Sequence, residues 1–382
     1  MTQSQQGEPK RHRSRRSAKR KMRLADVARR AGVSEATASR AINRPELVRQ
    51  EVRERVARAV QELSYVAHGA ARALASDRTH SIGLIVPTLR TAVFAESAEI
   101  LQQALNRSGY HLIIASSEYD KAREYHEVRA LLQHGIDGMV LVGQDHAPEL
   151  WQLLERSGLP FVTAFQHAGE SSYPCIGVDN RQEFYDATRF LINLGHTNIG
   201  VLTAETASNE RLAARVAGAR DCIGDHSLPK PDVVEVPSTL TDARQGLRRL
   251  VERNAHLTAV ACTNDLMAFG ALAECRTLGI DVPGQLSVIG FDDLDIAEHT
   301  QPSLTTVRLP LAEQSRRVGE YLLARIEGRD APSSTRLKAS FIVRESTGRP
   351  PEPARATAQR GTADAGPLQT PSSKKRARSA AE

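Results

Sequence analysis

The sequence predicts an α/β protein in which a small helical head precedes two doubly wound lobes of parallel sheet. From residue 81 onwards, short apolar runs alternate with amphipathic stretches of helical length, the pattern of repeated βα units. Most of these runs lack period-2 alternation, as expected of strands buried on both faces of a sheet. The segment from about residue 24 to residue 75 carries only helical signals. With 382 residues, 40% of them hydrophobic, the chain is long enough for two or three domains.

Three helices are expected in the head. Apolar residues recur at helical spacing from Leu24 to Ala31, and Gly32 ends this first helix. Ser34 is a suitable N-cap for a second helix that runs to Ile42. A third helix would place these apolar side chains on one face: Val52, Val56, Ala59, Val60 and Leu63. Three short helices, the first two joined by a turn that contains glycine, make a helix-turn-helix module.

Nine apolar runs are the candidate strands of the lobes. They are Ile82–Val86, Leu112–Ala115, Met139–Val142, Phe161–Phe165, Ile176–Val178, Ile199–Leu202, Val233–Val236, Ala259–Cys262 and Val288–Phe291. Two consecutive sets of units, one ending near Phe165 and the next beginning near Ile199, fit two lobes with a cleft between them. A single larger sheet is the alternative that this spacing leaves open.

The charge is distributed unevenly along the chain. The whole sequence has a formal net charge of +6, but residues 1–78 carry 19 basic and 8 acidic residues, and residues 349–382 carry 7 basic and 3 acidic. The body between these segments therefore has a net charge of −9. We expect this body to repel a polyanion and the basic head to attract one.

Several classes of protein are excluded by the sequence. Its longest apolar runs are only a handful of residues, far short of the ~20 needed to span a bilayer. The N-terminus lacks the apolar stretch of roughly 7–15 residues that a secretory signal needs, so we expect a cytoplasmic chain without a membrane partner. The four cysteines are widely separated, which argues against a zinc site or disulfides and favours reduced, mostly buried thiols: Cys175, Cys222, Cys262 and Cys275.

One stretch of the head carries a specific signature. Residues 24–43 read LADVARRAGVSEATASRAIN. This stretch resembles the DNA-binding signature of the lactose/galactose repressor (LacI/GalR) family, which fixes two helices, their turn and the recognition face together. The resemblance covers roughly residues 22–348 and continues through ELSY at 62–65, SIGL at 81–84, DG at 137–138, LGH at 194–196, ND at 264–265, SVIGFDD at 287–293 and LTT at 304–306.

The resemblance implies a transcription regulator that is a homodimer or a higher oligomer. Its partners would be double-stranded operator DNA and a small-molecule effector, by default a sugar or sugar acid, bound in a core similar to periplasmic sugar-binding proteins. We expect neither catalytic residues nor a cofactor or metal, and a place at the nucleoid. The resulting segments are a disordered basic arm (1–21), the helix-turn-helix domain (22–65), a hinge helix and linker (66–78), the two-lobed core (79–348) and a disordered tail (349–382).

The second helix of the head is the expected DNA reader. Its N-terminal side chains would enter the major groove, which is about 12 Å wide. Arg40 suits guanine, Glu35 suits cytosine, and Ala36 reaches only a thymine methyl or a sugar. The predicted DNA-contacting set in this helix is Ser34, Glu35, Ala36, Thr37, Ser39, Arg40 and Asn43. The alternatives are that Arg40 is a solvated surface charge, that Glu35 faces solvent, and that Thr37 is a helix hydroxyl without a DNA contact.

A candidate hinge helix follows the head, and a basic segment precedes it. Residues 66–74 fall where the family has a hinge helix, and Leu74 matches its minor-groove leucine, with His68 in the predicted DNA-contacting set. Ala67 stands where a proline is usual, and Leu74 is alternatively a first core contact. Lys10–Arg23 contains nine basic residues. They are either a flexible electrostatic arm or, if translation starts at Met22, mostly the result of a wrongly assigned start codon at Met1.

The effector site is expected at the carboxyl ends of the strands. Asp292 follows a predicted strand, and Arg215 matches an arginine that holds ligand hydroxyls in sugar-responsive relatives. The predicted effector-binding set is Thr88, Phe94, Arg215, Asn264, Asp265 and Asp292. The alternatives are a helix cap for Asp265, a cap or hinge turn for Asp292, a surface ion pair for Arg215 and a core position for Phe94.

Two departures from the family pattern bear on the effector. Asn209 stands where purine-responsive relatives carry an arginine, which disfavours a purine. Thr241 stands where many relatives place an aromatic side chain from the loop before the next helix.

An enzyme is disfavoured because the sequence lacks G-x-G-x-x-G opening a βαβ unit, G-x-x-x-x-G-K-[ST] and G-x-S-x-G. A pure solute-binding protein would need a signal peptide and no helix-turn-helix.

Overall fold

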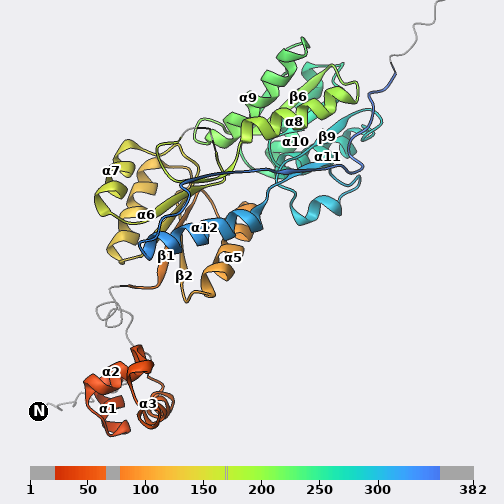
Figure 1. Ribbon diagram of the computed structural model, residues 1–382. Coiled ribbons are helices and arrows are strands. Elements are labelled where there is room, and N and C mark those ends of the chain that lie inside the picture. The colour runs from red at the N-terminus through yellow and green to blue at the C-terminus, as the bar shows by residue number, and fades with distance from the viewer. Residues whose placement is uncertain (1–21, 66–77, 168, 170, 353–382) are drawn as a thin grey trace, which may run out of the picture.

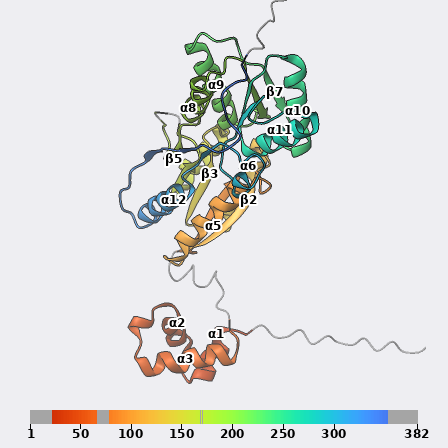
Figure 2. The ribbon, with the colours of Figure 1, turned by 90° about the vertical axis from the view of Figure 1, so that its right-hand side faces the viewer.

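The computed structural model describes residues 22–65, 78–167, 169 and 171–352 (Figures 1 and 2). The head consists of α1 (Leu24–Ala31), α2 (Glu35–Asn43) and α3 (Gln50–Glu62), with a 3-10 turn at Pro45–Leu47. Gly32 ends α1 with a φ of 65°, and the Ser34 hydroxyl accepts a hydrogen bond of 3.1 Å from the backbone N–H of Thr37. The predicted turn and caps are therefore confirmed. A small core of Val27, Ala31, Val56 and Ala59 holds the three helices together.

The first lobe is a six-stranded parallel sheet in the order β11-β5-β4-β3-β1-β2. Its strands are β1 (Ser81–Val86), β2 (His111–Ser116), β3 (Gly138–Val142), β4 (Phe161–Ala164), β5 (Cys175–Val178) and β11 (Ser334–Leu337). The helices α5 (Ala92–Asn106) and α12 (Leu311–Ile326) pack on one face, and α6 (Lys121–Gln133) and α7 (Pro148–Ser157) pack on the other (Figure 1).

The second lobe is a four-stranded parallel sheet in the order β7-β6-β8-β9. Its strands are β6 (Ile199–Ala204), β7 (Val233–Val236), β8 (Ala259–Cys262) and β9 (Ser287–Ile289). The helices are α8 (Asn180–Asn193), α9 (Glu210–Asp225), α10 (Leu240–Arg253) and α11 (Asp265–Leu278). A 3-10 turn lies at Asp295–Glu298, and β10 (Thr306–Arg308) pairs antiparallel with β12 (Ser340–Ile342). The two lobes are thus built on two separate parallel sheets, and not on one larger sheet.

The two lobes are not consecutive units of the chain, which corrects the sequence-based expectation. After β9 and β10 the chain returns to the first lobe to form α12 and β11, and it crosses back again to β12. The three strands that the sequence did not predict are short and partly polar, as in STRL for β11, so no apolar run marks them.

Strand β2 also differs from the expectation of burial on both faces. It lies at the edge of its sheet, where Ile113 is 37% exposed and Ile114 41% exposed. The other first-lobe runs are buried, and all four cysteines are free and buried as predicted. Within the described residues, no helix is both long and apolar enough to cross a membrane. His68 and Leu74 lie outside the described residues.

Candidate effector cleft and DNA-reading head

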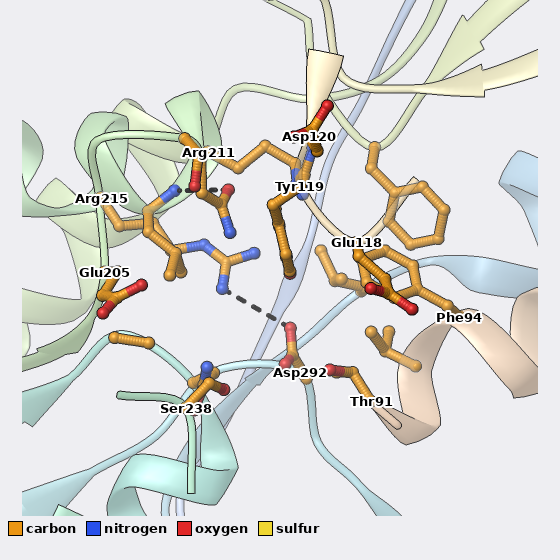
Figure 3. Close-up of a pocket in the computed structure, with 18 residues that line it drawn as sticks. Thr91, Phe94, Glu118, Tyr119, Asp120, Glu205, Arg211, Arg215, Ser238 and Asp292 are labelled. Carbon is orange, nitrogen blue, oxygen red and sulfur yellow. Dashed lines mark hydrogen bonds and ion pairs between the residues drawn. The ribbon is translucent and has the colours of Figure 1, made fainter. Parts of the chain in front are cut away.

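A cavity of about 360 Å³ lies between the lobes, at the carboxyl ends of both sheets (Figure 3). Its walls come from the segments that follow β1, β2 and β4 on one side and β6, β7, β8 and β9 on the other. This is the place where open parallel sheets bind ligands, and the volume suits a small molecule.

Arg215, on α9, is the most constrained side chain of the cavity. Its Nε donates to Asn180 Oδ1 at 2.8 Å, and its Nη1 donates to the Thr263 carbonyl at 2.6 Å. The guanidinium carbon lies 3.5 Å from the centre of the Phe291 ring, and Nη1 lies 3.6 Å from Asp292 Oδ1. These contacts fix the arginine, and its remaining donors have no partner among the described residues. Because the side chain is buried, the alternative of a surface ion pair does not hold.

Burial dominates the protonation of the charged groups here. Desolvation lowers the pKa of Arg215 to about 10, although Asp292 opposes this shift. Desolvation raises the pKa of Asp292 to about 6, and Arg215 and Arg211 oppose that rise. The arginine therefore remains charged at neutral pH, and the carboxylate beside it is ionised there and ready to accept ligand hydroxyls.

The backbone at Asp292 is strained in the direction that the site needs. Asp292 has a φ of 118° and Asp293 a φ of 54°, positive backbone angles that residues other than glycine rarely adopt. Asp293 is anchored by Arg308 at 2.5 Å and Arg344 at 2.7 Å. Because Asp293 is held from behind, Asp292 is turned into the cavity opposite Arg215 (Figure 3).

The first lobe contributes aromatic rings to the same cavity. Phe94 and Phe165 meet edge to face, with their centres 5.3 Å apart. Glu118 and Tyr119 have φ values of 52° and 61°, so the loop after β2 is strained as well. Burial raises the pKa of Tyr119, and Arg211 counteracts this rise through its charge and a side-chain hydrogen bond. The Tyr119 hydroxyl is therefore a neutral group at the boundary between the lobes.

The first turn of α9 connects the two lobes. Oε1 of Glu210 accepts a hydrogen bond of 3.0 Å from the backbone N–H of Gln144, and Nη1 of Arg211 lies 3.4 Å from the Val142 carbonyl. Gly143 lies between these contacts with a φ of 91°, and a Cβ atom there would lie 2.1 Å from Oε1 of Glu210. Only glycine allows this approach of α9 to the end of β3.

Four of the six predicted effector residues line the cavity, and two do not. Phe94, Arg215, Asn264 and Asp292 line it. Thr88 is outside the lining and accepts a hydrogen bond from the Arg90 N–H at 3.1 Å. Asp265 is buried behind the cavity, where it accepts from the Thr306 hydroxyl at 2.6 Å and the Leu294 N–H at 2.8 Å.

Two local details correct the sequence-based interpretation of this lobe. The N-cap of α11 is Asn264, which accepts from the Met267 N–H at 2.9 Å, and not Asp265. Thr241 lies inside α10, and the residue of that segment that reaches the cavity is Ser238. Both errors are shifts of one to three residues at a helix start, where sequence signals are least sharp.

Several residues of the cavity were not predicted from the sequence, chiefly Tyr119 and Arg211. Tyr119 follows the predicted strand Leu112–Ala115, so the carboxyl-end rule applied to this strand would have indicated it. Arg211 lies one helical turn before Arg215 and therefore shares its face of α9. The other missed lining residues are Thr91, Val93, Glu118, Asp120, Phe165, Ala204, Glu205, Ser208, Asn209, Leu212, Ser238 and Leu309.

The head presents the predicted reading face to solvent. Glu35, Ala36 and Arg40 are exposed on α2, and Arg40 pairs with no carboxylate among the described residues. Thr37 and Ser34 share a hydrogen bond of 2.8 Å, and Asn43 donates to the Ser39 hydroxyl at 3.3 Å. Ser34 and Thr37 therefore stabilise the helix start, and the DNA contacts of this helix remain predictions.

Comparison with known proteins agrees with both the helical head and the two-lobed core. Residues 23–68 match the model of bacterial regulatory proteins of the lacI family, and residues 188–347 match a periplasmic binding protein-like domain. The HTH-type transcriptional regulator GalR of Escherichia coli K12 is 32% identical over 329 residues, covering 84% of this chain and 94% of that protein. The chain belongs to the lacI family.

Two further similarities extend the match. The HTH-type transcriptional repressor PurR of Vibrio parahaemolyticus is 34% identical over 315 residues, covering 80% of this chain and 92% of that protein. A solved complex of the transcriptional regulator CelR with cellobiose has a TM-score of 0.63 and 27% identity, covering 85% of this chain and 99% of that one. This lacI-family chain is a DNA-binding transcription regulator with a ligand-binding core.

Proposed function

We propose that this lacI-family regulator binds a palindromic operator as a homodimer and represses transcription, with a sugar or sugar acid in the cleft changing its affinity for the operator. The observation that carries the proposal is the pairing, in one chain, of an exposed recognition helix with a cavity whose walls come from two lobes. A ligand that prefers one arrangement of the lobes shifts the population of that arrangement.

Recognition of DNA is assigned to α2. In a dimer, two copies of α2 would read two half-sites of a palindrome, with Arg40 on guanine and Glu35 on cytosine. The net charge of +11 over residues 1–78 supplies attraction to phosphates, while the acidic body limits contact to the head and hinge. His68 and Leu74 retain their proposed hinge roles in the minor groove, outside the described residues.

Recognition of the effector is assigned to Arg215, Asp292 and Asn264, with Phe94 providing an apolar face. The fixed guanidinium donates to ligand oxygens, and the carboxylate accepts from hydroxyls, a combination suited to polyols. The similar structure of the transcriptional regulator CelR in complex with cellobiose supports a sugar-type ligand. A coupling of ~1–3 kcal/mol between the sites would change operator affinity about 5–150-fold.

Fluorescence anisotropy tests this function directly. A labelled palindrome from upstream of the protein's own gene is titrated with the full-length protein, with and without a panel of sugars and sugar acids. We expect salt-dependent binding that one ligand of the panel changes at least fivefold. No operator binding at any salt concentration, with or without ligand, would sink the proposal.

Two arginine variants separate specific reading from general charge. Arg40→Ala should lower the preference for the operator over unrelated DNA by about 1–3 kcal/mol, because a bidentate contact with guanine is lost. Arg58→Ala, on the exposed face of α3, is the matched control for loss of one charge. Equal effects of both variants would show that Arg40 contributes only charge.

A further inference from the structure

Helix α9 brings two arginines to the cavity, and their surroundings differ. Arg215 has Asp292 opposite it at 3.6 Å, but among the described residues the only carboxylate that pairs with Arg211 is its neighbour Glu210, at 3.5 Å. Glu210 is itself engaged by the Gln144 N–H at 3.0 Å. Both arginine side chains are only 7% exposed. Arg211 is therefore a nearly buried cation with weak compensation.

The other acidic residues of the lining do not supply that compensation. Glu118 pairs with Arg123 at 2.7 Å and is 62% exposed. Asp120 caps α6 by accepting from the Arg123 N–H at 2.8 Å, and Glu205 is exposed at the rim. Within the buried part of the cavity, two guanidinium groups thus face one carboxylate, that of Asp292.

A nearly buried cation with a weak counter-charge is costly, and a bound anion reduces that cost. The fork of a guanidinium matches the oxygens of a carboxylate or phosphate, and the N-terminus of α9 adds positive potential beside it. We propose that the effector is a polyhydroxylated anion, a sugar acid or a sugar phosphate, whose charged group binds Arg211 while Arg215 and Asp292 hold its hydroxyls. This inference rests on the proposed function.

Tyr119 lies on the opposite lobe of the cavity from Arg211. Arg211 points towards Tyr119 (Figure 3), and its positive charge opposes the rise that burial causes in the pKa of the tyrosine. An anionic group that accepts from Arg211 can therefore also accept from the Tyr119 hydroxyl, which belongs to the other lobe. The same anion that compensates the arginine would hold the lobes together, and this links recognition of the charge to the lobe arrangement.

Matched ligand pairs test the charge requirement. Thermal shift and calorimetric titration of the full-length protein use neutral aldoses beside their own acids and phosphates: glucose, gluconate, glucuronate and glucose 6-phosphate, and the corresponding galactose, mannose, ribose and arabinose series. We expect an anionic member of the panel to stabilise the protein and to bind it with at least tenfold higher affinity than its neutral parent does. Acids and phosphates form separate arms, so the response also identifies the kind of anion.

Variants assign the effect to Arg211. Arg211→Gln should weaken binding of the responding anion tenfold or more and leave the weak binding of the neutral parent nearly unchanged. Arg211→Lys keeps the charge and loses the forked pair of donors. Its affinity for the anion should lie between those of the wild type and Arg211→Gln. Arg220→Gln is the control, because Arg220 is an exposed residue of the same helix outside the cavity.

Each outcome decides between the claims. A neutral sugar that binds as tightly as its acid and its phosphate, or a panel in which no anion binds, overturns the anionic effector. The proposed function survives the first result if the neutral sugar still changes operator affinity. An anion that binds equally well to Arg211→Gln also overturns the assignment, and circular dichroism of the variant shows that it is folded.

Discussion

The two lobes face one cavity and contribute different chemistry to it. The first lobe supplies aromatic and apolar surface, chiefly Phe94, Tyr119 and Phe165. The second supplies most of the buried polar and charged groups, including Arg211, Arg215 and Asp292. Polar contacts fix the orientation of a ligand, whereas aromatic surface covers it and excludes water. The second lobe should therefore determine affinity and specificity, and the first should determine how firmly the lobes close.

The largest expected effect comes from removing a buried charged side chain of the second lobe. Arg215→Ala leaves Asp292 buried without its cation, which costs about 3–5 kcal/mol of the free energy of unfolding. It should also abolish the ligand response and leave ligand-free DNA binding intact. Urea denaturation and operator anisotropy measure the two effects, with Arg220→Ala as control. An unchanged ligand response would show that Arg215 is only structural.

The second prediction concerns pH and the buried acids of the second lobe. Desolvation raises the pKa of Asp265 to about 8, and the nearby Asp292 adds to the rise. A carboxyl whose pKa is higher in the folded than in the unfolded state binds more protons when folded, so stability falls as pH rises from about 4 towards 8. Each unit of difference is worth roughly 1.4 kcal/mol.

Asp265→Asn isolates this contribution. Between pH 5 and pH 8 the wild type should lose stability that the variant retains, as measured by urea denaturation at several pH values. Glu118→Gln, in an exposed position of the first lobe, is the control and should leave the pH profile unchanged. Parallel profiles of wild type and Asp265→Asn would contradict a raised pKa at Asp265.

The contact between lobes gives a smaller effect. Gly143→Ala places a methyl group 2.1 Å from Glu210 Oε1 and imposes a φ of 91° on alanine. Strain costs of order 1–3 kcal/mol, and displacing Glu210 adds the loss of its hydrogen bond to Gln144, about 1 kcal/mol. Gly158→Ala also has a positive φ, 65°, but no atom within 4 Å of its added Cβ. The difference between the two variants in unfolding and in ligand affinity measures the contact itself, and no difference would exclude it.

The smallest effect is expected at the hydroxyl that the first lobe contributes. Tyr119→Phe keeps the ring and removes the hydroxyl beside Arg211, which should weaken ligand affinity by about 0.5–1.5 kcal/mol with little change in stability. Calorimetric titration with the responding ligand measures this loss. If Tyr119→Phe weakened binding more than Arg211→Gln, the first lobe and not the second would determine recognition.

Sequence patterns predicted the parts of the fold that depend on neighbouring residues. The cap at Ser34, the turn at Gly32 and the nine apolar strands are local signals, and the structure contains all of them. The strands β10, β11 and β12 lack such a signal, because their pairing with distant partners replaces an apolar pattern of their own. Thr88 was misplaced because a position after a strand does not determine which way the following loop turns.

The sequence by itself therefore determined the helix-turn-helix head, the alternating βα order and the two conspicuous residues of the cleft, Arg215 and Asp292. Only the tertiary structure decided that α12 and β11 return to the first lobe, that Asp265 lies behind the cavity, and that Arg211 meets Tyr119. The physical reason is that caps and periodicity act over a few residues, whereas these outcomes depend on strand order and crossovers. Such crossovers bring together side chains that are about ninety positions apart in the chain, as Tyr119 and Arg211 are.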